Sequence, residues 1–556
     1  MSEKFEMVAK TFQGLEGVLS DELKALGADD VKEGRRMVSF KGDKEMMYRA
    51  NFCLRTALRV LKPIHQFKSS DADDLYRQVK DFDWSSIMTE NSTFSIDTTV
   101  FSDSFRHSRF VTYRVKDAIA DYFNEKCGKR PSIRLTSPDF KFNVHISDHD
   151  VILSLDSSGE PLYKRGWRVA QTDAPINEVL AAGILKLSGW GGKSNLVDPM
   201  CGSGTFLIEA ALMAANINPG VFRTDFAFQH WADYDSDLYD QIYNDDSQER
   251  EFNFKIFGSD VSPKAIAITR ANVKSSGVAK YIDIELKSIQ DYTELPAEGK
   301  GVLVTNPPYG ERLKPDDLAG LYATLGEKLK RVFRGYDAWV IASNEELIDQ
   351  IGLKPSVKYP LFNGDLPCEL REYVIFDGSF SELRRAGGSI KNEGFRRSED
   401  KRKLYRRDGG DHRPSFRHDG ADKPGRREGG FGKRREGGDD RRFGQGRRDE
   451  ARRRFDRDGE ERRQAGAFRS ERPYAERGRA DDENGATDAK EAFWHSEAFR
   501  RKMLRGRKPT LGVENERPIV HGRRNGWKRK GLDESNNDNN NSNNSNNSDN
   551  NTSTND

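Results

Sequence analysis

Three short apolar segments constrain the fold most, because each ends in a polar residue and two of them run directly into a helical pattern. In chain order, the first ends at Asp198, the second ends at Asp260, and the third ends just before Asn306. Strands that alternate with helices form a parallel sheet, and ligands bind at the carboxyl ends of its strands. We therefore expect an α/β domain with these three residues on one rim of its sheet.

The third segment leads into T-N-P-P-Y-G-E-R, residues 305–312. The prolines, Pro307 and Pro308, end the strand in a rigid loop. Asn306 offers a side-chain carbonyl, Pro307 a backbone carbonyl, and Tyr309 a flat aromatic face. Two acceptors beside an aromatic plane suit a planar NH2 group on a stacked ring. The alternative is an ordinary strand-to-loop turn, which Asn-Pro alone would favour.

The first segment leads into D-P-M-C-G-S-G-T. Gly202 and Gly204 allow the backbone to approach a ligand closely, and a helix that starts near Thr205 supplies free N–H groups. Asp198 at the strand end suits an ammonium group better than a phosphate. The turn lacks G-K-[ST] and the third glycine of G-x-G-x-x-G, so it is not a phosphate loop. Cys201 belongs to this turn, where we interpret it as a packing residue.

The second segment places Asp260 where a carboxylate can hold ribose hydroxyls. An acidic and aromatic insertion, residues 217–252, separates it from the glycine turn. Periodicity predicts further elements of this region: a helix after Pro175, a strand over 254–258, a helix over 263–275, strands over 282–286 and 338–342, and a hairpin of 358–361 with 373–376.

The amino-terminal third has the pattern of a small split α+β domain followed by further strands. The expected elements are a strand over 5–9, a helix over 17–26, a hairpin over 31–40, a helix over 43–50, strands over 94–100, 140–146 and 151–156, and a helix over 110–122.

Residues 104–116 interleave basic and aromatic side chains, which reach phosphates and stack on unpaired bases. The basic candidates for RNA contact are Arg106, Arg109 and Arg114, and the later run K-R-G-W-R adds Lys164, Arg165 and Arg168. The alternative for residues 104–116 is a helix with its aromatic side chains in the core and its arginines in solvent.

The formal net charge of +2 hides a strong asymmetry. Residues 391–480 carry 30 basic against 19 acidic residues, a net of +11, and residues 481–556 balance, which leaves −9 for residues 1–390. The folded part is therefore not broadly basic, and RNA affinity must come from local patches or from the tail.

The four cysteines form no C-x-x-C pair, which argues against structural zinc and a disulfide framework. We expect no metal. No cysteine directly follows the prolines after Asn306, so a cysteine nucleophile is not expected there, and Cys368 is interpreted as a packing residue. The start of the chain lacks the apolar core of a signal peptide, and no run of 18 apolar residues occurs. We expect a cytoplasmic protein without a membrane partner.

The carboxyl-terminal stretch, residues 386–556, is rich in Arg, Gly and Asp and ends in an Asn/Ser run. Such a composition buries too little apolar surface to offset chain entropy, so disorder is expected. Scattered phenylalanines among arginines favour a low-specificity RNA tether, and a solvating linker is the alternative.

At this point the chain resembles a known family. D-P-M-C-G-S-G-T with N-P-P-Y resembles the class I S-adenosylmethionine-dependent amino-methyltransferases, and D-S-S-G-E-P-L-Y-K-R-G-W-R running into A-P-I-N-E-V-L-A-A resembles the THUMP-containing RNA methyltransferases. N-P-P-Y-G-E-R and F-N-G-D-L-P-C-E-L-R are similar to the bacterial enzymes that methylate the 2-amino group of a guanine in 23S ribosomal RNA. The resemblance covers roughly residues 1–380.

The resemblance implies a Rossmann-like methyltransferase domain behind an amino-terminal α+β region, ferredoxin-like plus THUMP. The implied boundaries are 1–60 for the ferredoxin-like part, 61–160 for THUMP, 161–385 for the methyltransferase domain and 386–556 for the disordered tail. The implied cofactor is S-adenosylmethionine, and the partner is 23S ribosomal RNA or a pre-ribosomal particle.

The resemblance also implies roles for residues. Asp198, Gly202 and Gly204, with Cys201 and Thr205 in the same turn, would line the methionine end of the cofactor. Asp260 would hold its ribose, and residues 306–309 would receive the base. The family often has an acidic residue near Ser288 for the adenine amine; here the sequence reads K-S-I-Q-D, so Asp291 or backbone groups would substitute.

The function implied is methylation of a guanine 2-amino group in large-subunit ribosomal RNA. N-P-P-Y serves either purine, so an adenine amino-methyltransferase acting on RNA or DNA is an alternative. A second alternative is a non-catalytic RNA-binding assembly factor that keeps the fold, although the intact strand-end residues speak against it.

Overall fold

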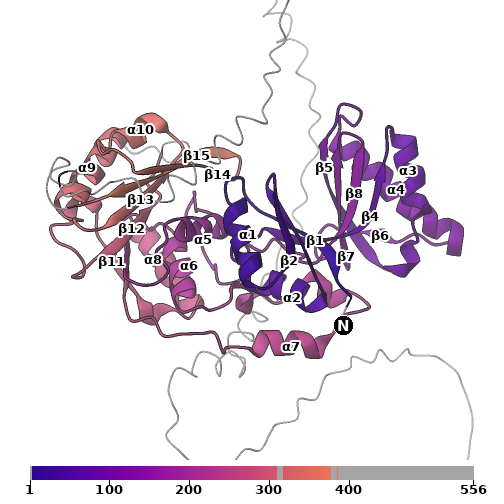
Figure 1. Ribbon diagram of the computed structural model, residues 1–556, viewed down its shortest axis with the longest axis horizontal. Helices are drawn as coiled ribbons and strands as arrows, with labels where there is room; N and C mark the ends of the chain where they lie inside the picture. The colour runs from indigo at the N-terminus through magenta and orange to yellow at the C-terminus, as the bar shows by residue number, and fades with distance from the viewer. Residues whose placement is uncertain (1–2, 310–316, 377–384, 386–556) are drawn as a thin grey trace, which may run out of the picture. The chain divides into compact units, whose positions relative to one another are not determined.

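A computed structural model of the chain describes residues 3–309, 317–376 and 385. The predictions for residues 310–312 and for the tail lie outside this part. Two β-sheets organise the described residues (Figure 1). Within the same residues, no helix has both the length and the apolar character needed to cross a bilayer.

The first sheet has the strand order β2-β3-β1-β4-β8-β7-β5-β6. Its strands are β1 (Phe5–Lys10), β2 (Asp29–Gly34), β3 (Met37–Gly42), β4 (Arg59–Lys68), β5 (Thr93–Phe101), β6 (Ser132–Ile133), β7 (Phe140–Ser147) and β8 (Asp150–Asp156). The predicted hairpin and the three later strands are confirmed.

Strand β4 joins the two halves of this sheet, and the sequence analysis did not identify it. Val8 of β1 pairs with Leu61 of β4, and Phe67 of β4 pairs with Val151 of β8. Pro63 removes a donor from the strand, and the register with β8 shifts just after it. The irregular alternation that results explains why no strand pattern was visible there.

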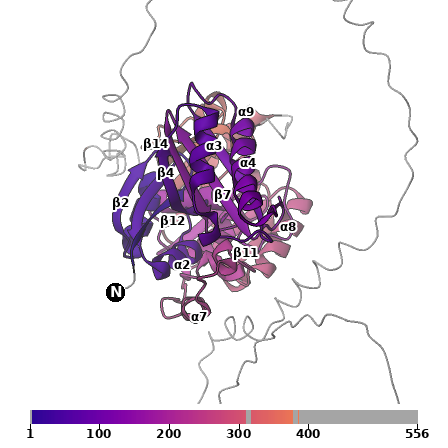
Figure 2. The same cartoon turned by 90° about the vertical axis from the view of Figure 1, so that its right-hand side faces the viewer.

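Helices cover this sheet, and acidic caps start two of them. They are α1 (Glu16–Ala25), α2 (Lys44–Cys53), α3 (Ala72–Asp81) and α4 (Ser108–Cys127). Asp43 accepts a hydrogen bond from the Met46 amide, and Asp71 caps α3 in the same way. Helices α3 and α4 lie side by side (Figure 2).

The second sheet has the order β11-β10-β9-β12-β13-β15-β14, and Figure 1 labels most of these strands in succession. They are β9 (Asn195–Asp198), β10 (Ile256–Asp260), β11 (Ile282–Leu286), β12 (Gly301–Thr305), β13 (Asp337–Ala342), β14 (Val357–Asn363) and β15 (Leu366–Val374). Strands β9 to β13 are parallel. The chain order reverses between β9 and β12, which is where ligands bind in open α/β sheets.

The helices of this region are α5 (Glu178–Leu187), α6 (Thr205–Ala214), α7 (Ser236–Asn244), α8 (Pro263–Ser275), α9 (Leu318–Arg331) and α10 (Glu345–Asp349). Its single-turn 3-10 helices are η2 (Pro219–Phe222), η3 (Ala227–His230), η4 (Ala279–Tyr281) and η5 (Ile289–Asp291), and a further one, η1 (Trp84–Ser86), lies in the region of the first sheet. Helix α9, which the sequence analysis did not name, packs Tyr322, Leu325 and Leu329 into a core with Leu303 of β12.

The predicted final hairpin is confirmed, but its second strand begins at Leu366 rather than at residue 373. The charged residues inside β15 hide the strand pattern in the sequence. Arg371 is buried, at 2% exposed, and forms ion pairs with the partly exposed Glu369, at 2.5 Å, and with the exposed Asp349 of α10.

The insertion at residues 217–252 is an aromatic layer packed on α2. The Phe228 ring stacks on Tyr48 with centroids 4.3 Å apart, and Tyr239 meets Tyr48 edge-on at 6.2 Å. Arg55, which follows α2, donates to the Ile217 carbonyl at 2.6 Å. The insertion follows helix α6 in the chain and therefore connects α6 to the amino-terminal domain, which contains the first sheet and α2.

Candidate active site

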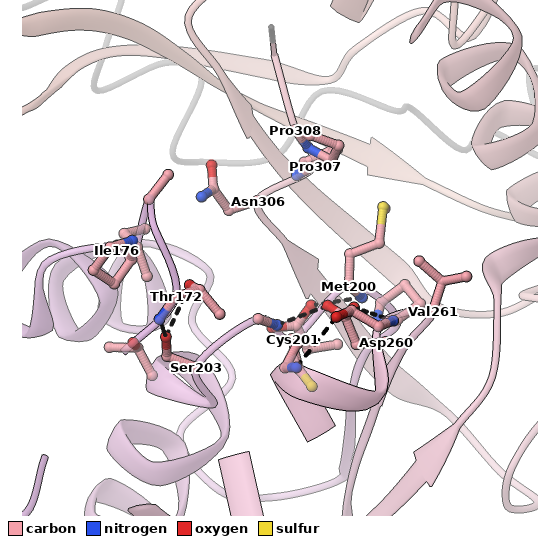
Figure 3. Close-up of a pocket in the computed structure, with 18 of the residues that line it drawn as sticks. Thr172, Ile176, Met200, Cys201, Ser203, Asp260, Val261, Asn306, Pro307 and Pro308 are labelled. Carbon is pink, nitrogen blue, oxygen red and sulfur yellow. Dashed lines mark hydrogen bonds between the residues drawn. The ribbon is translucent and has the colours of Figure 1, made fainter. Parts of the chain in front are cut away.

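A cavity of about 490 Å³ lies at the switch point of the second sheet, within the usual size range of small-molecule sites. Asp198, Asp260 and Asn306 all line it, as the strand pattern predicts. Figure 3 labels Asp260 and Asn306. Residues 172–176 form a further part of the wall. Three strand ends and one incoming segment thus surround a single space.

The glycine turn between β9 and α6 is held tightly. Gly202 and Gly204 have φ angles of 56° and 79°, a region that favours glycine. A Cβ on Gly204 would come within 2.8 Å of the Thr269 methyl group, while the Thr269 hydroxyl donates to the Gly202 carbonyl at 2.7 Å. The Cys201 amide donates to the Ser259 carbonyl at 2.9 Å. These contacts leave the turn little room to move.

Asp198 is a buried carboxylate, 1% exposed, at the end of β9. Its Oδ1 accepts hydrogen bonds from the Thr305 hydroxyl at 2.9 Å and from the Met200 amide at 3.2 Å. Burial raises the pKa of Asp198 to about 7, with a further contribution from the charge of Asp260, against the effect of those two hydrogen bonds. A nearby cationic ligand would therefore strongly favour the ionised form of this carboxyl group.

Asp260 ties together the loops that follow β9 and β10. Its Oδ2 accepts from the Gly202 amide at 3.0 Å, and its Oδ1 accepts from the Ser262 amide at 2.9 Å. Ser262 in turn caps α8 through the Ala265 amide. A carboxylate has about four acceptor positions, so each oxygen keeps capacity for a ligand hydroxyl.

The loop after β12 faces the glycine turn across the cavity. Figure 3 draws Asn306 with its side chain directed into the space toward the Ile176 wall, beside Pro307 and Pro308. Tyr309 also lines the cavity, and its hydroxyl accepts a hydrogen bond of 3.1 Å from Nδ2 of Asn363. Acceptors and an aromatic ring are therefore in place on one side.

Residues 172–176, which form part of the cavity wall, were not predicted from the sequence. The Thr172 amide donates to the Ser203 hydroxyl at 2.8 Å, and Asn272 of α8 donates to the Ser203 carbonyl at 2.9 Å. Asn272 also accepts from the amides of Val169 and Ala170. The run A-P-I-N-E, which carries part of the family resemblance, was the available signal for this segment.

Two predicted cofactor residues do not line the cavity. Gly204 lies behind the turn against Thr269. Asp291 directs its carboxylate to the Ser288 amide at 3.1 Å, and Ser288 and Ile289 line the cavity instead. The backbone alternative for the adenine contact therefore fits the geometry better than Asp291.

The prediction that Arg165 contacts RNA is wrong. Its side chain is 2% exposed, donates to the Arg55 carbonyl at 2.6 Å and pairs with Glu209 of α6 at 3.3 Å. Arg168 is also largely enclosed: it donates to Glu178 at 2.7 Å and to the Thr205 hydroxyl at 2.8 Å. Both arginines instead fix α6, the helix that starts at the glycine turn. Lys164 is exposed and pairs with Glu160.

Helix α4 and the residues just before it present the remaining RNA-contact candidates. Arg106 and Arg109 are exposed, whereas Arg114 pairs with Asp73 at 2.6 Å. Two of the neighbouring rings lie at the surface, because Phe110 and Tyr113 are 53% and 55% exposed; a third, Phe105, is buried. The alternative that places the aromatic side chains in the core therefore fails for two of the three rings.

Three family models match consecutive parts of the chain: an RlmL ferredoxin-like domain at residues 6–61, a THUMP domain at 69–156, and an RMKL-like methyltransferase domain at 165–372. A Synechocystis protein provisionally named as an RNA methyltransferase is 38% identical over 371 residues, which cover 66% of this chain and 96% of that one. The chain belongs to the RMKL-like methyltransferase family. The resemblance drawn from the sequence is thereby confirmed.

Other members of the family are longer. The ribosomal RNA large subunit methyltransferase K/L of Syntrophotalea carbinolica is 41% identical over 391 residues, which cover 68% of this chain and 55% of the relative. The enzyme of the same name from Marinomonas is 37% identical, and the match covers 66% of this chain and 52% of the relative. The chain thus spans about half the length of these relatives.

Solved structures support the same fold. A crystal structure of a provisionally assigned methyltransferase complexed with SAH has a TM-score of 0.60 and 29% identity, and the match covers 68% of this chain and all of that one. A Listeria monocytogenes protein, described as a predicted N6-adenine-specific DNA methylase, has a TM-score of 0.60 and 30% identity, with 67% and 97% covered.

Proposed function

We propose that this protein transfers a methyl group from S-adenosylmethionine to the exocyclic 2-amino group of a guanine in large-subunit ribosomal RNA. The observation that carries the proposal is the single cavity in which the glycine turn, Asp260 and residues 306–309 meet. The relatives named as ribosomal RNA large subunit methyltransferases support the choice of RNA.

The lining of the cavity fits this cofactor from end to end. The buried carboxylate of Asp198 suits the ammonium of the methionine part, and Asp260 keeps acceptor capacity for ribose hydroxyls. Val261 and Ile289 supply apolar contact for the adenine ring. When bound, the cofactor supplies a methyl group on a sulfonium, which is an excellent leaving group.

The protein's own task is placement rather than acid-base chemistry. An aryl amine has its lone pair delocalised into the ring, so acceptors that favour a pyramidal nitrogen prepare it for attack. Asn306 and the Pro307 carbonyl provide such acceptors, and Tyr309 provides a stacking face for a base taken out of its helix. Alignment of this kind is worth several kcal/mol, on the order of what orientation contributes in enzymes.

The amino-terminal region would bind the RNA. The exposed rings and arginines of α4 lie within the part matched by the THUMP model and combine stacking with phosphate contact. The Arg/Gly-rich tail, outside the described residues, would add a weak tether. A ribosomal RNA substrate would place the enzyme in the bacterial cytoplasm.

An adenine amino-methyltransferase is the second candidate, favoured by the name of the Listeria neighbour. Two acceptors and a ring can receive either purine amine, so the test must read both products. Purified protein is incubated with deproteinised ribosomal RNA and S-adenosylmethionine, and the digested nucleosides are analysed by mass spectrometry. The proposal expects N2-methylguanosine, and N6-methyladenosine would support the second candidate acting on RNA. No methylated nucleoside would contradict the proposal, and the same incubation with DNA then tests the second candidate acting on DNA.

A further inference from the structure

We propose that Asn363 is a positioning residue for Tyr309: it fixes the aromatic ring against which the target base stacks. The inference rests on the proposed function and names a residue of the β14–β15 hairpin as part of the machinery. Asn363 does not line the cavity, so it reaches the substrate through the tyrosine.

The contact joins two distant parts of the methyltransferase domain. Nδ2 of Asn363 donates to the Tyr309 hydroxyl at 3.1 Å across 54 residues of sequence. Both side chains are half-buried. Tyr309 belongs to the loop after β12, and Asn363 is the last residue of β14. The ring is thus held at its far end by a strand at the edge of the sheet.

The hairpin is a firm base for such a contact. Asn363 pairs with Leu366 across a two-residue turn in which Gly364 has a φ of 67°. Further along, Arg371 of β15 is buried and pairs with Glu369 and with Asp349 of α10. The position of Asn363 is therefore determined by the sheet rather than by a free loop.

The amino-terminal domain, which contains the first sheet, packs against strand β14 from outside the catalytic region. Gly14, with a φ of 92°, lies so close to β14 that a Cβ there would come within 2.8 Å of the Pro360 carbonyl oxygen and 2.9 Å of a Leu361 methyl group. Pro360 lies three residues before Asn363. The strand that holds the tyrosine is thus supported on both sides.

A stacking ring benefits from this hydrogen bond because a tyrosine can otherwise swing about its side-chain torsions. Loss of one hydrogen bond of this kind costs about 1 kcal/mol, or about five-fold in an equilibrium constant. A phenylalanine at position 309 would stack but could not accept the bond. The two groups should therefore behave as one unit.

A double-mutant cycle tests the inference. Wild type, Asn363→Ala, Tyr309→Phe and the double variant are compared in methyl transfer to deproteinised ribosomal RNA, with SAH affinity measured by calorimetry. Each single variant is expected to raise the KM for RNA about five-fold, with SAH affinity changed less than about two-fold. The double variant is expected to be no worse than either single one.

Asp365→Asn is the matched control, because Asp365 is an exposed turn residue of the same hairpin; it should behave as wild type. A double variant whose loss equals the product of the two single losses would overturn the inference, as would a fall in SAH affinity with Asn363→Ala. Wild-type protein that methylates no nucleoside would instead contradict the proposed function.

Discussion

The Thr305 hydroxyl donates a hydrogen bond of 2.9 Å to Oδ1 of Asp198, and so joins the last residue of β12 to the last residue of β9. These strands flank the point where the chain order reverses. This hydrogen bond therefore fixes the loop with the amine acceptors relative to the loop with the glycines. The spacing of the two loops sets the distance between the cofactor and the target base in the proposed reaction.

Asp198→Asn tests the role of the raised pKa. We expect SAH to bind wild-type protein less well as pH falls through about 7, because protonation removes the carboxylate that would pair with its ammonium. The Asn variant should bind more weakly at pH 8 and show little dependence on pH between 6 and 8. Calorimetric titration at several pH values measures this, and parallel pH profiles for the two proteins would contradict it.

The same substitution should stabilise the cofactor-free protein. Since the pKa of Asp198 is higher in the folded than in the unfolded chain, the folded state binds more protons between about pH 4 and 7, and the free energy of unfolding falls as pH rises through that window. The Asn variant lacks this loss. Urea unfolding should find it more stable than wild type at pH 8, with the difference shrinking toward pH 4. Equal stability at pH 8 would argue against the raised pKa.

Asn306→Ala should abolish most of the methyl transfer while the cofactor still binds. The side chain projects into the cavity but makes none of the contacts that hold the glycine turn. Loss of one preorganised polar group in an active site costs roughly 100-fold in kcat. Steady-state transfer and SAH titration measure the two effects separately. A variant with undiminished turnover would remove Asn306 from the mechanism.

Much of the catalytic sheet follows from local patterns. The strand ends at Asp198 and the helix start at Thr205 are where the sequence predicts them, because turn glycines and strand-end polar residues are local signals. Asp291 shows a signal that was overlooked: S-x-x-D is a capping pattern, and the structure has that reciprocal pair with Ser288.

The errors concern partners that are distant in sequence. K-R-G-W-R looks like an exposed basic and aromatic run, but Arg165 pairs with Glu209, 44 residues away, and with the backbone at Arg55, 110 residues away. The contact of Thr172 with Ser203 is equally non-local. No periodicity reports such pairs, so burial of charge could not be deduced from the sequence.

Arg165→Met should destabilise the protein by about 3–5 kcal/mol, because Glu209 would be left as a buried, unpaired carboxylate. The double variant Arg165→Met with Glu209→Gln should recover part of that loss, since neither member of the pair then carries a charge. Urea unfolding monitored by circular dichroism measures both. A single variant as stable as wild type would mean that the ion pair does not stabilise α6.

Phe110→Ala should weaken RNA binding by roughly five-fold or more without changing stability, because an exposed ring that stacks on a base contributes at least ~1 kcal/mol. Arg109→Ala should lower the affinity for RNA. It should also reduce the slope of the logarithm of the binding constant against the logarithm of salt concentration by about 1, because one phosphate contact is lost. Fluorescence anisotropy with a ribosomal RNA fragment at several salt concentrations measures both. Phe254→Ala, at a 42% exposed ring outside the THUMP match, is the control that should bind normally. Equal loss from the control variant would assign the effect to something other than α4.

Under the proposed function, residues 306–309 present a guanine amine to the methyl donor. The most direct measurement is nucleoside mass spectrometry of large-subunit ribosomal RNA from cells that lack the gene, complemented with wild type or with Asn306→Ala. We expect N2-methylguanosine to fall in the deletion strain and to return with wild type but not with the variant. An unchanged N2-methylguanosine content, or its full recovery with Asn306→Ala, would contradict it.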